Sequence, residues 1–373
     1  MAYNLKCPQC NVVQPVRLLK QQDDGKLRCS NNACRQSRHM IGWMHSTTTS
    51  PHPVVGAPPP NTYVLWGEQT KECFGPGFLR GHMEGESDLR PGAAAQPLGG
   101  DYTALAGGTS PVHIYIVKDD VMLKGMFYAA NGNGAATGLT VMLLNGSGAS
   151  IGHYMNDVVT GYLALGAAVL AVDYRGIGES TGRGTAHGLY MDAEAMLRYL
   201  TDHISRGGRQ VAADRVVVHG FSIGSAPATD LARKHCGHDP LRLGALVLHC
   251  PIASFGSAAA FKQPPGTTAR MKKVVSKVAS WGVGFDNKKK MLHIDLPVHV
   301  IYAQNDTFVD PADARTLGGV LRGGAATTLQ SCRFGDHTNV SYIFNNAFNT
   351  IAAHATAPTT GTLDGFLTGL PRN

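Results

Sequence analysis

Short apolar runs alternate with longer amphipathic segments from about residue 110 onward. The apolar runs are near-continuous rather than interleaved with polar residues, which is typical of parallel strands buried on both faces. The segments between them are long enough to be helices that cover such a sheet. Among others, strands are expected at 139–146, 214–220 and 243–250, and helices at 151–166, 188–204 and 225–236. The pattern predicts an α/β fold with a mostly parallel sheet and helices on both faces.

One serine stands between two glycines where an expected strand meets an expected helix. The stretch 220–224 reads GFSIG, and its central residue is Ser222. A serine on so tight a turn projects its hydroxyl clear of the sheet, and the glycines allow the strand and the helix to approach closely. The helix N-terminus also directs backbone N–H groups at this place. Ser222 is therefore a candidate nucleophile, and a plain glycine-rich turn is the alternative.

Two further polar side chains follow expected strands later in the chain. Asp306 comes after the strand expected at 296–304, and His337 comes after the strand expected at 327–334. Because functional groups gather at the carboxyl ends of parallel strands, both are placed to meet Ser222. Asp310 is a competing carboxylate, and an ordinary turn aspartate is the alternative interpretation.

Five stretches in order resemble those of an α/β-hydrolase: LLNGSG, DYRGIGESTG, GFSIGSAPA, YAQNDTFVDP and GDHTN. Residues 121–345 are similar to the branch of small esterases, thioesterases and serine aminopeptidases. The order Ser222, Asp306, His337 is the order that this fold requires for a catalytic triad. The resemblance implies that Ser222 is the nucleophile, that His337 is the general base and then the acid, and that Asp306 orients the imidazole.

The resemblance also implies two backbone N–H donors for the developing oxyanion. One is the N–H of Ile223, which follows the nucleophile, and the other is the N–H of Ser147 in the NGSG turn. The chain differs from the family at two nearby positions. Asn145 stands where a histidine is usual, and Ala303 stands where a glycine is common.

Two other groups at expected strand ends are interpreted as structural. Asp173, Arg175 and Ser180 lie in DYRGIGES and are expected to fix a loop beside the site. His249 and Cys250 end another expected strand. They are expected to pack near the pocket rather than to form a second nucleophile pair.

The first 34 residues contain two pairs of cysteines, C-x2-C and C-x4-C, separated by 18 residues. This is the layout of a zinc ribbon. A module with so few apolar residues needs a bound metal ion to stabilise its fold. Four thiolates fill a tetrahedral zinc shell, so the zinc is expected to be structural, and no cofactor is expected for catalysis. Free cysteines in a flexible head, or a clustered lipidation site, are the alternatives. The predicted ligands are Cys7, Cys10, Cys29 and Cys34.

The chain is expected to have a zinc-ribbon-like module at 1–45, a Pro/Gly-rich linker at 46–109 with a short ordered piece around 61–69, and an α/β-hydrolase domain at 110–373 with a short basic lid at 254–293. The net charge of +7 is concentrated in the lid. The stretch 270–285, RMKKVVSKVASWGVGF, is expected to form a lid helix with Met271 on its apolar side and Lys272 on its basic side. This helix either packs its apolar face on the core or attracts an anionic membrane surface or an anionic substrate. Because the charge is confined to one patch, nucleic acid is not expected as a partner.

These features predict a serine hydrolase that cleaves an acyl ester or thioester through an acyl-enzyme on Ser222. A serine peptidase acting on short peptides, and an inactive hydrolase domain in a zinc-ribbon adaptor, are the alternatives. The N-terminus lacks a basic region followed by an apolar core, and no apolar run is long enough to span a bilayer. A cytoplasmic location is therefore expected, with export that needs no cleaved signal as the alternative.

Overall fold

The structure is a computed structural model of the 373-residue chain. The residues that it describes are 4–6, 13–15, 20–21, 27–28, 63–65, 106–116, 119–130, 137–146, 150–151, 156–182, 184–261, 267–272, 285–320, 327–332, 336–337, 341–344 and 362–370. In these parts of the chain, no helix combines the length and the apolar character needed to cross a bilayer.

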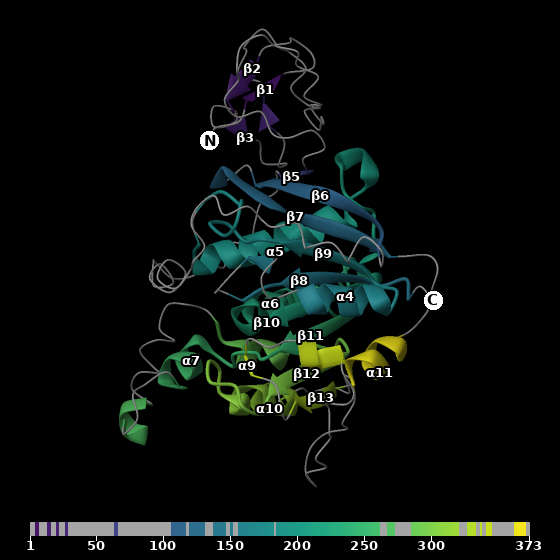
Figure 1. Cartoon of the computed structure of the whole chain (residues 1–373). Helices are drawn as coiled ribbons and strands as arrows, with labels where there is room; N and C mark the ends of the chain where they lie inside the picture. Colours follow the sequence, from purple (N-terminus) through teal and green to yellow (C-terminus); the bar gives the residue numbers. More distant parts are fainter. Residues whose placement is uncertain are drawn as a thin grey trace.

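A nine-stranded sheet forms the centre of the fold (Figure 1). Its strands are β5 (Tyr63–Leu65), β6 (Ala106–Ile116), β7 (Val121–Ala130), β8 (Thr140–Leu144), β9 (Ala168–Val172), β10 (Val216–Phe221), β11 (Ala245–His249), β12 (Val298–Ala303) and β13 (Thr327–Cys332). Their order across the sheet is β13-β12-β11-β10-β8-β9-β7-β6-β5. The strands from β13 to β9 run parallel, and β7 is antiparallel to both β9 and β6. The predicted mostly parallel sheet is confirmed.

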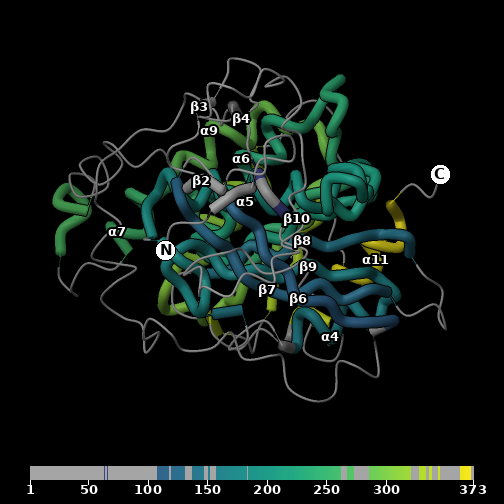
Figure 2. Tube along the Cα trace, turned by 90° about the horizontal axis from the view of Figure 1, so that it is seen from above, coloured from purple at the N-terminus to yellow at the C-terminus, as the bar shows by residue number. Residues whose placement is uncertain are grey.

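Helices cover both faces of this sheet, as Figures 1 and 2 show. They are α4 (Asn156–Ala164), α5 (Ala186–Thr201), α6 (Ser225–Lys234), α7 (Phe255–Phe261), α9 (Asn287–Met291), α10 (Pro311–Gly319) and α11 (Leu363–Thr368). Along β8, Met142 and Leu144 join a core that includes α5, α6 and α10, whereas Val141 and Leu143 join a core that includes α4 and α11. Since successive side chains of a strand point to opposite faces, the two cores lie on opposite sides of the sheet. The predicted arrangement of helices is confirmed.

Part of the sheet lies within the predicted linker, at the short ordered piece expected around 61–69. The strand β5 lies within 46–109 and pairs in parallel with β6, whose first residues also lie there. Tyr63 explains this pairing, because its side chain is buried and its hydroxyl donates to Asp202 Oδ2 at 2.7 Å. Its ring also packs edge-on against that of Tyr199. Three residues carry no periodic signal, so these contacts become visible only in the folded chain.

Short strands near the N-terminus form two antiparallel pairs. The first pair is β1 (Asn4–Lys6) with β2 (Val13–Pro15), and the second is β3 (Lys20–Gln21) with β4 (Leu27–Arg28). The zinc ribbon predicted at 1–45 stays a prediction, because its four ligands lie outside the described residues. These are Cys7, Cys10, Cys29 and Cys34.

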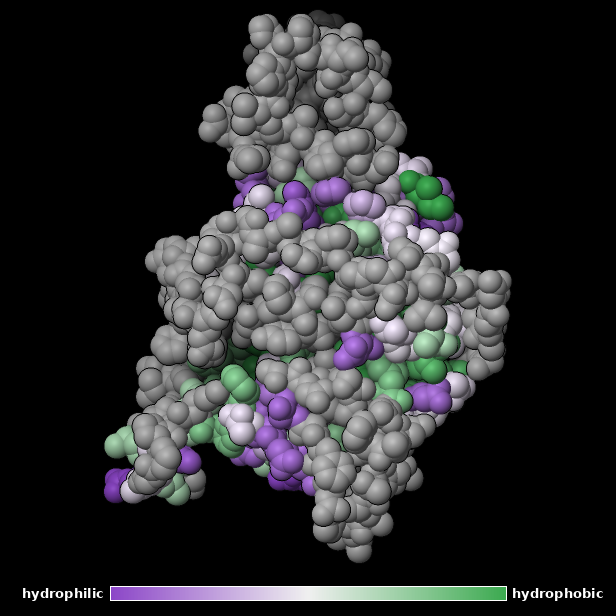
Figure 3. All heavy atoms as spheres, in the orientation of Figure 1, coloured by the Kyte–Doolittle hydropathy of each residue, from purple (hydrophilic) through white to green (hydrophobic). Residues whose placement is uncertain are grey.

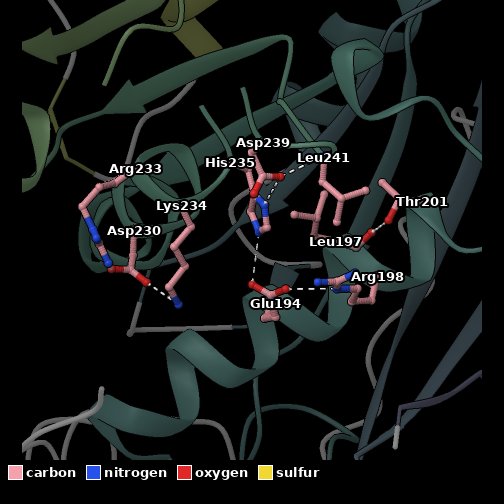
Figure 4. Close-up of polar contacts among 10 residues, drawn as sticks. All are labelled: Glu194, Leu197, Arg198, Thr201, Asp230, Arg233, Lys234, His235, Asp239 and Leu241. Atoms are coloured by element: carbon pink, nitrogen blue, oxygen red, sulfur yellow. Dashed lines mark hydrogen bonds and ion pairs between the residues drawn. The ribbon is translucent and has the colours of Figure 1, made fainter. Parts of the chain in front are cut away.

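A polar cluster joins α5 to the end of α6 (Figure 4). The imidazole of His235 lies between two carboxylates, 3.4 Å from Glu194 and 3.1 Å from Asp239. Burial alone would lower the pKa of His235, but the hydrogen bonds and charges of the two carboxylates hold it above its ordinary value. Glu194 also accepts a hydrogen bond from Arg198 at 3.2 Å. The two helices are therefore held together partly by charge.

The basic segment 254–293 carries part of its charge in ion pairs. Lys290 of α9 is half-buried, and its Nζ lies 3.1 Å from Asp230 Oδ1. Figure 3 shows hydrophilic residues gathered in the region of α9 and α10.

Met271, predicted on the apolar side of a lid helix, is 55% exposed. The part of that predicted helix that follows Lys272 lies outside the described residues.

Candidate active site

Strand β10 passes into α6 through a single helical turn, and Ser222 is the first residue of that turn. The turn η6 (Ser222–Gly224) directly follows β10 and directly precedes α6. Ser222 has a φ of 52°, in the left-handed region. An L-residue in this region costs on the order of 1–3 kcal/mol, and such strain is typical of functional sites. The conformation is that of a nucleophile elbow, which lifts the serine hydroxyl out of the sheet.

Two glycines give this turn the space that it needs. A Cβ on Gly220 would lie 2.6 Å from Cβ of Ala228 in α6. A Cβ on Gly224 would overlap the carbonyl oxygen of Leu144 in β8. The predicted close approach of strand and helix is therefore confirmed, because a side chain at Gly220 would force β10 and α6 apart and one at Gly224 would push the turn away from β8.

The structure brings Ser222, His337 and Asp306 together at the carboxyl edge of the sheet. Nε2 of His337 lies 3.0 Å from Oγ of Ser222, and Nδ1 lies 2.7 Å from Oδ2 of Asp306. Asp306 and His337 are buried, whereas Ser222 is partly exposed. The competing carboxylate, Asp310, instead caps α10 by accepting a hydrogen bond from the N–H of Ala312 at 2.8 Å.

The second carboxylate oxygen of Asp306 binds the backbone of its own loop. Oδ1 accepts hydrogen bonds from the N–H groups of Phe308 and Val309, each at 2.8 Å. Burial would raise the pKa of Asp306, but the hydrogen bond and charge of His337, together with these two backbone donors, hold it below its ordinary value. Asp306 is therefore an ionised acceptor with a fixed orientation.

Two aromatic rings flank the imidazole of His337. The ring of Phe308 stacks on it with a centroid distance of 5.3 Å and an interplanar angle of 25°. The ring of Phe221 lies on it at 5.1 Å and 32°. Phe308 is 44% exposed, so it presents an apolar surface beside His337. Phe308 is not predicted from the sequence, although its place two residues after Asp306 could have indicated that it lies near the site.

Of the two predicted oxyanion donors, Ile223 lies within the described residues and Ser147 does not. Ile223 directly follows Ser222 in the turn and is buried. Ser147 lies outside the described residues, so its role stays a prediction. The Asn145 side chain, which replaces the usual histidine, is buried and accepts a hydrogen bond from the N–H of Gly146 at 2.8 Å. Asn145 thus supports the backbone just before the predicted donor.

The DYRGIGES loop is tied to the segment that follows β8. Oδ1 of Asp173 accepts a hydrogen bond from the N–H of Ile151 at 2.8 Å, which ties the end of β9 to the segment after β8. Burial raises the pKa of Asp173 to about 7. Arg175 is buried between Asp192 and Asp119, with N–O distances of 2.7 and 2.8 Å. These contacts agree with the structural role expected for the loop.

A family model described as "Serine aminopeptidase, S33" matches residues 136–330, just over half of the chain. The chain belongs to this family. It is a hydrolase with the α/β-hydrolase fold, and the matched residues include Ser222 and Asp306.

Relatives of this family member include parts of much longer proteins. "Multifunctional-autoprocessing repeats-in-toxin" of Vibrio vulnificus is 30% identical over 210 residues, which cover 53% of this chain and 4% of the toxin. "Alpha/beta hydrolase domain-containing protein aho-3" of Caenorhabditis elegans is 28% identical over 172 residues, which cover 46% of this chain and 44% of that protein. The chain therefore spans less than half the length of either relative.

A solved structure shows the same fold. The crystal structure of an alpha-beta hydrolase from Vibrio vulnificus superposes with a TM-score of 0.57 and 21% sequence identity. The match covers 75% of this chain and 96% of that one. The fold is thus that of an α/β-hydrolase through most of the chain.

Proposed function

We propose that this family member is a serine hydrolase that cleaves a carboxylic ester or thioester through an acyl-enzyme on Ser222. The observation that carries the proposal is the contact between Ser222 Oγ and His337 Nε2 at 3.0 Å, made by a serine with a φ of 52°. A serine hydroxyl is a weak nucleophile until an adjacent base accepts its proton. Here the strained turn places the hydroxyl at that base.

In the proposed reaction, Oγ of Ser222 attacks the acyl carbon while Nε2 of His337 accepts the hydroxyl proton. Asp306 holds the ring with its proton on Nδ1 and stabilises the imidazolium that forms. The N–H groups of Ile223 and Ser147 are the proposed donors to the oxyanion. Such a donor is worth roughly 3–4 kcal/mol of transition-state stabilisation. His337 then passes the proton to the leaving alcohol or thiol, and water releases the acyl group by the same steps.

The position of Phe308 supports the proposal that the substrate has an apolar acyl group or leaving group. The exposed ring of Phe308 stacks on the imidazole of His337, beside the proposed base. Hydrolysis of a short aminoacyl amide is the second candidate, favoured by the description of the matched family. An inactive adaptor is disfavoured, because His337 contacts both Ser222 and Asp306 as an acyl-transfer site requires.

A side-by-side substrate panel tests the proposal. A p-nitrophenyl butyrate ester, a butyryl thioester and an aminoacyl p-nitroanilide are given to the full chain and to Ser222→Ala. The proposal expects turnover of the ester or thioester, loss of turnover in Ser222→Ala, and an acyl adduct on Ser222 by mass spectrometry. Turnover of the anilide alone would support the peptidase candidate instead.

We also propose that Cys7, Cys10, Cys29 and Cys34 bind a structural zinc ion. In the sequence, Cys7 and Cys10 lie between the paired strands β1 and β2, and Cys29 directly follows β4, as in a ribbon built from two hairpins. Metal analysis of the purified chain should find one equivalent of zinc more than in Cys7→Ser. Equal zinc content in the two proteins would contradict the proposal.

A further inference from the structure

Three neighbouring strands each deliver one metal-ligating side chain to the same place. Cys250 follows β11, Asp306 follows β12 and His337 follows β13. The thiol sulfur, a carboxylate oxygen and a ring nitrogen of these residues all lie within 4.8 Å of one another, and all three residues are buried. We propose that they form an inhibitory binding site for a zinc-like divalent cation.

The sheet itself holds Cys250 in this position. The backbone N–H of Cys250 donates to the carbonyl of Ile301 at 2.8 Å, which ties it to β12, the strand that precedes Asp306. Cys250 has a φ of 43°, in the left-handed region that an L-residue rarely adopts. The interpretation of Cys250 as a packing residue accounts for its burial. It does not account for the closeness of its thiol to two further ligand atoms.

The donor set selects the class of metal. Thiolate, imidazole and carboxylate are all zinc ligands, whereas Mg²⁺ and Ca²⁺ take oxygen ligands. A thiolate and a carboxylate together carry two negative charges, which a divalent cation balances in a buried place. Zinc bonds of about 2.0–2.3 Å put the ligand atoms of one ion roughly 3.3–3.8 Å apart. Side-chain movements of about 1 Å would bring the three ligand atoms to these separations. The fourth coordination position of the ion is left for water.

A cation bound here and the proposed acyl transfer exclude each other. On binding, the Cys250 thiol releases its proton to solvent. If Nε2 of His337 is the ligand, the lone pair that would accept the Ser222 proton is occupied. If Nδ1 is the ligand, the contact with Asp306 is broken and the remaining ring proton sits on Nε2. In both cases His337 cannot act as a base. The inhibition rests on the proposed function, whereas the metal site does not.

A cadmium titration of the full chain tests the site without reference to activity. Cd²⁺ bound to thiolates gives a charge-transfer absorption that counts the thiolate sites. Cys250→Ser should bind one equivalent fewer than the natural chain. Cys332→Ser is the matched control, because Cys332 is equally buried at the end of β13 and outside the cluster. It should bind as many equivalents as the natural chain. Equal binding by Cys250→Ser and the natural chain overturns the site, and Cys250→Ala serves if the serine variant does not fold.

Labelling of Ser222 by a fluorophosphonate tests the inhibition. Zn²⁺ should slow the labelling of the natural chain at least tenfold, a chelator should restore it, and Mg²⁺ should have no effect. In Cys250→Ser, the zinc concentration for half-inhibition should rise at least tenfold, and in Cys332→Ser it should not change. Equal inhibition in Cys250→Ser overturns the inhibitory role. Absence of labelling without added metal would contradict the proposed function instead, and the number of cadmium equivalents would still decide the site.

Discussion

Asp306 holds His337 with one carboxylate oxygen and its own loop with the other. Oδ2 lies 2.7 Å from Nδ1 of His337, and Oδ1 accepts the backbone N–H groups of Phe308 and Val309 at 2.8 Å. Because the loop supplies only donors to Oδ1, the carboxylate cannot rotate without losing two hydrogen bonds. The orientation of the imidazole toward Ser222 thus depends on the loop that follows β12.

Replacing Asp306 by Asn should abolish activity while preserving the loop. The Asn oxygen must keep accepting the two backbone N–H groups, so its NH₂ group faces Nδ1 and the ring proton moves to Nε2. That tautomer cannot accept the Ser222 proton, and kcat should fall roughly 10⁴-fold. Steady-state hydrolysis of the best substrate measures the effect.

Asp310→Asn is the control for this prediction, because it removes a charge four residues away. Its side chain caps α10, and Asn caps a helix about as well as Asp. Its kcat should stay within about twofold of the natural value, since N-caps of similar rank differ little. Equal losses in the two variants would show that charge in this loop, rather than the orientation of His337, decides activity.

Gly224→Ala should destabilise the fold through one steric contact. Its Cβ would overlap the carbonyl oxygen of Leu144 in the central strand β8, so a backbone must move. We expect a loss of about 3 kcal/mol in the free energy of unfolding. Gly319→Ala is the matched control, because a Cβ at this end of α10 meets nothing within 4 Å. It should stabilise by about 0.4–1 kcal/mol. Urea denaturation compares the two, and similar effects would refute the packing argument.

The His235 cluster should make stability depend on pH. His235 has a folded-state pKa above its ordinary 6.5, so its contribution is fully present below pH 6.5 and is lost as the pH rises through the folded value. Its partner Glu194 has a pKa held below 4.5, despite the opposing effect of burial, and contributes above that pH. The difference in unfolding free energy between the natural chain and His235→Gln should therefore be larger at pH 6 than at pH 9.

Thermal or urea unfolding at the two pH values measures this difference. His238→Gln is the control, because His238 is exposed and lies between His235 and Asp239 in the chain without belonging to either of the two ion pairs of His235. It should show no such change. A His235→Gln effect that is equal at both pH values would mean that His235 acts through packing alone.

Phe308→Ala should weaken the binding of apolar substrates. Removing the exposed ring beside His337 deletes an apolar contact surface, and we expect KM for an apolar ester to rise about tenfold, or about 1.4 kcal/mol. Ile204→Ala removes an apolar side chain that is 66% exposed in the short helix Ile204–Arg206, which follows α5, and should leave KM unchanged. A fall in kcat with constant KM would instead make Phe308 a support for the His337 ring.

The parts of this fold that could be predicted depend on short-range patterns. The apolar strands and the GFSIG turn can each be recognised within a few residues. The turn is recognisable because a Cβ on Gly220 would meet α6 and a Cβ on Gly224 would meet β8, so that only glycine fits at either position. Their order in the chain then places Asp306 and His337 at the same edge of the sheet.

The missed features depend on contacts between distant residues. Arg175 meets Asp119 across 56 residues, and Tyr63 meets Asp202 across 139. The closeness of Cys250 to His337 follows from the strand order β11-β12-β13, which cannot be predicted from the local sequence of any one strand. Such pairs carry no periodic signal, so only the folded structure reveals them.

The most direct test of the central claim is to label the purified protein, without added divalent metal, with a fluorophosphonate and map the adduct by peptide mass spectrometry. The proposed mechanism predicts a single adduct on Ser222, which is absent in Ser222→Ala and forms far more slowly in His337→Ala. No adduct on the folded chain, or an adduct whose rate of formation is the same without His337, would contradict an activated serine at this site.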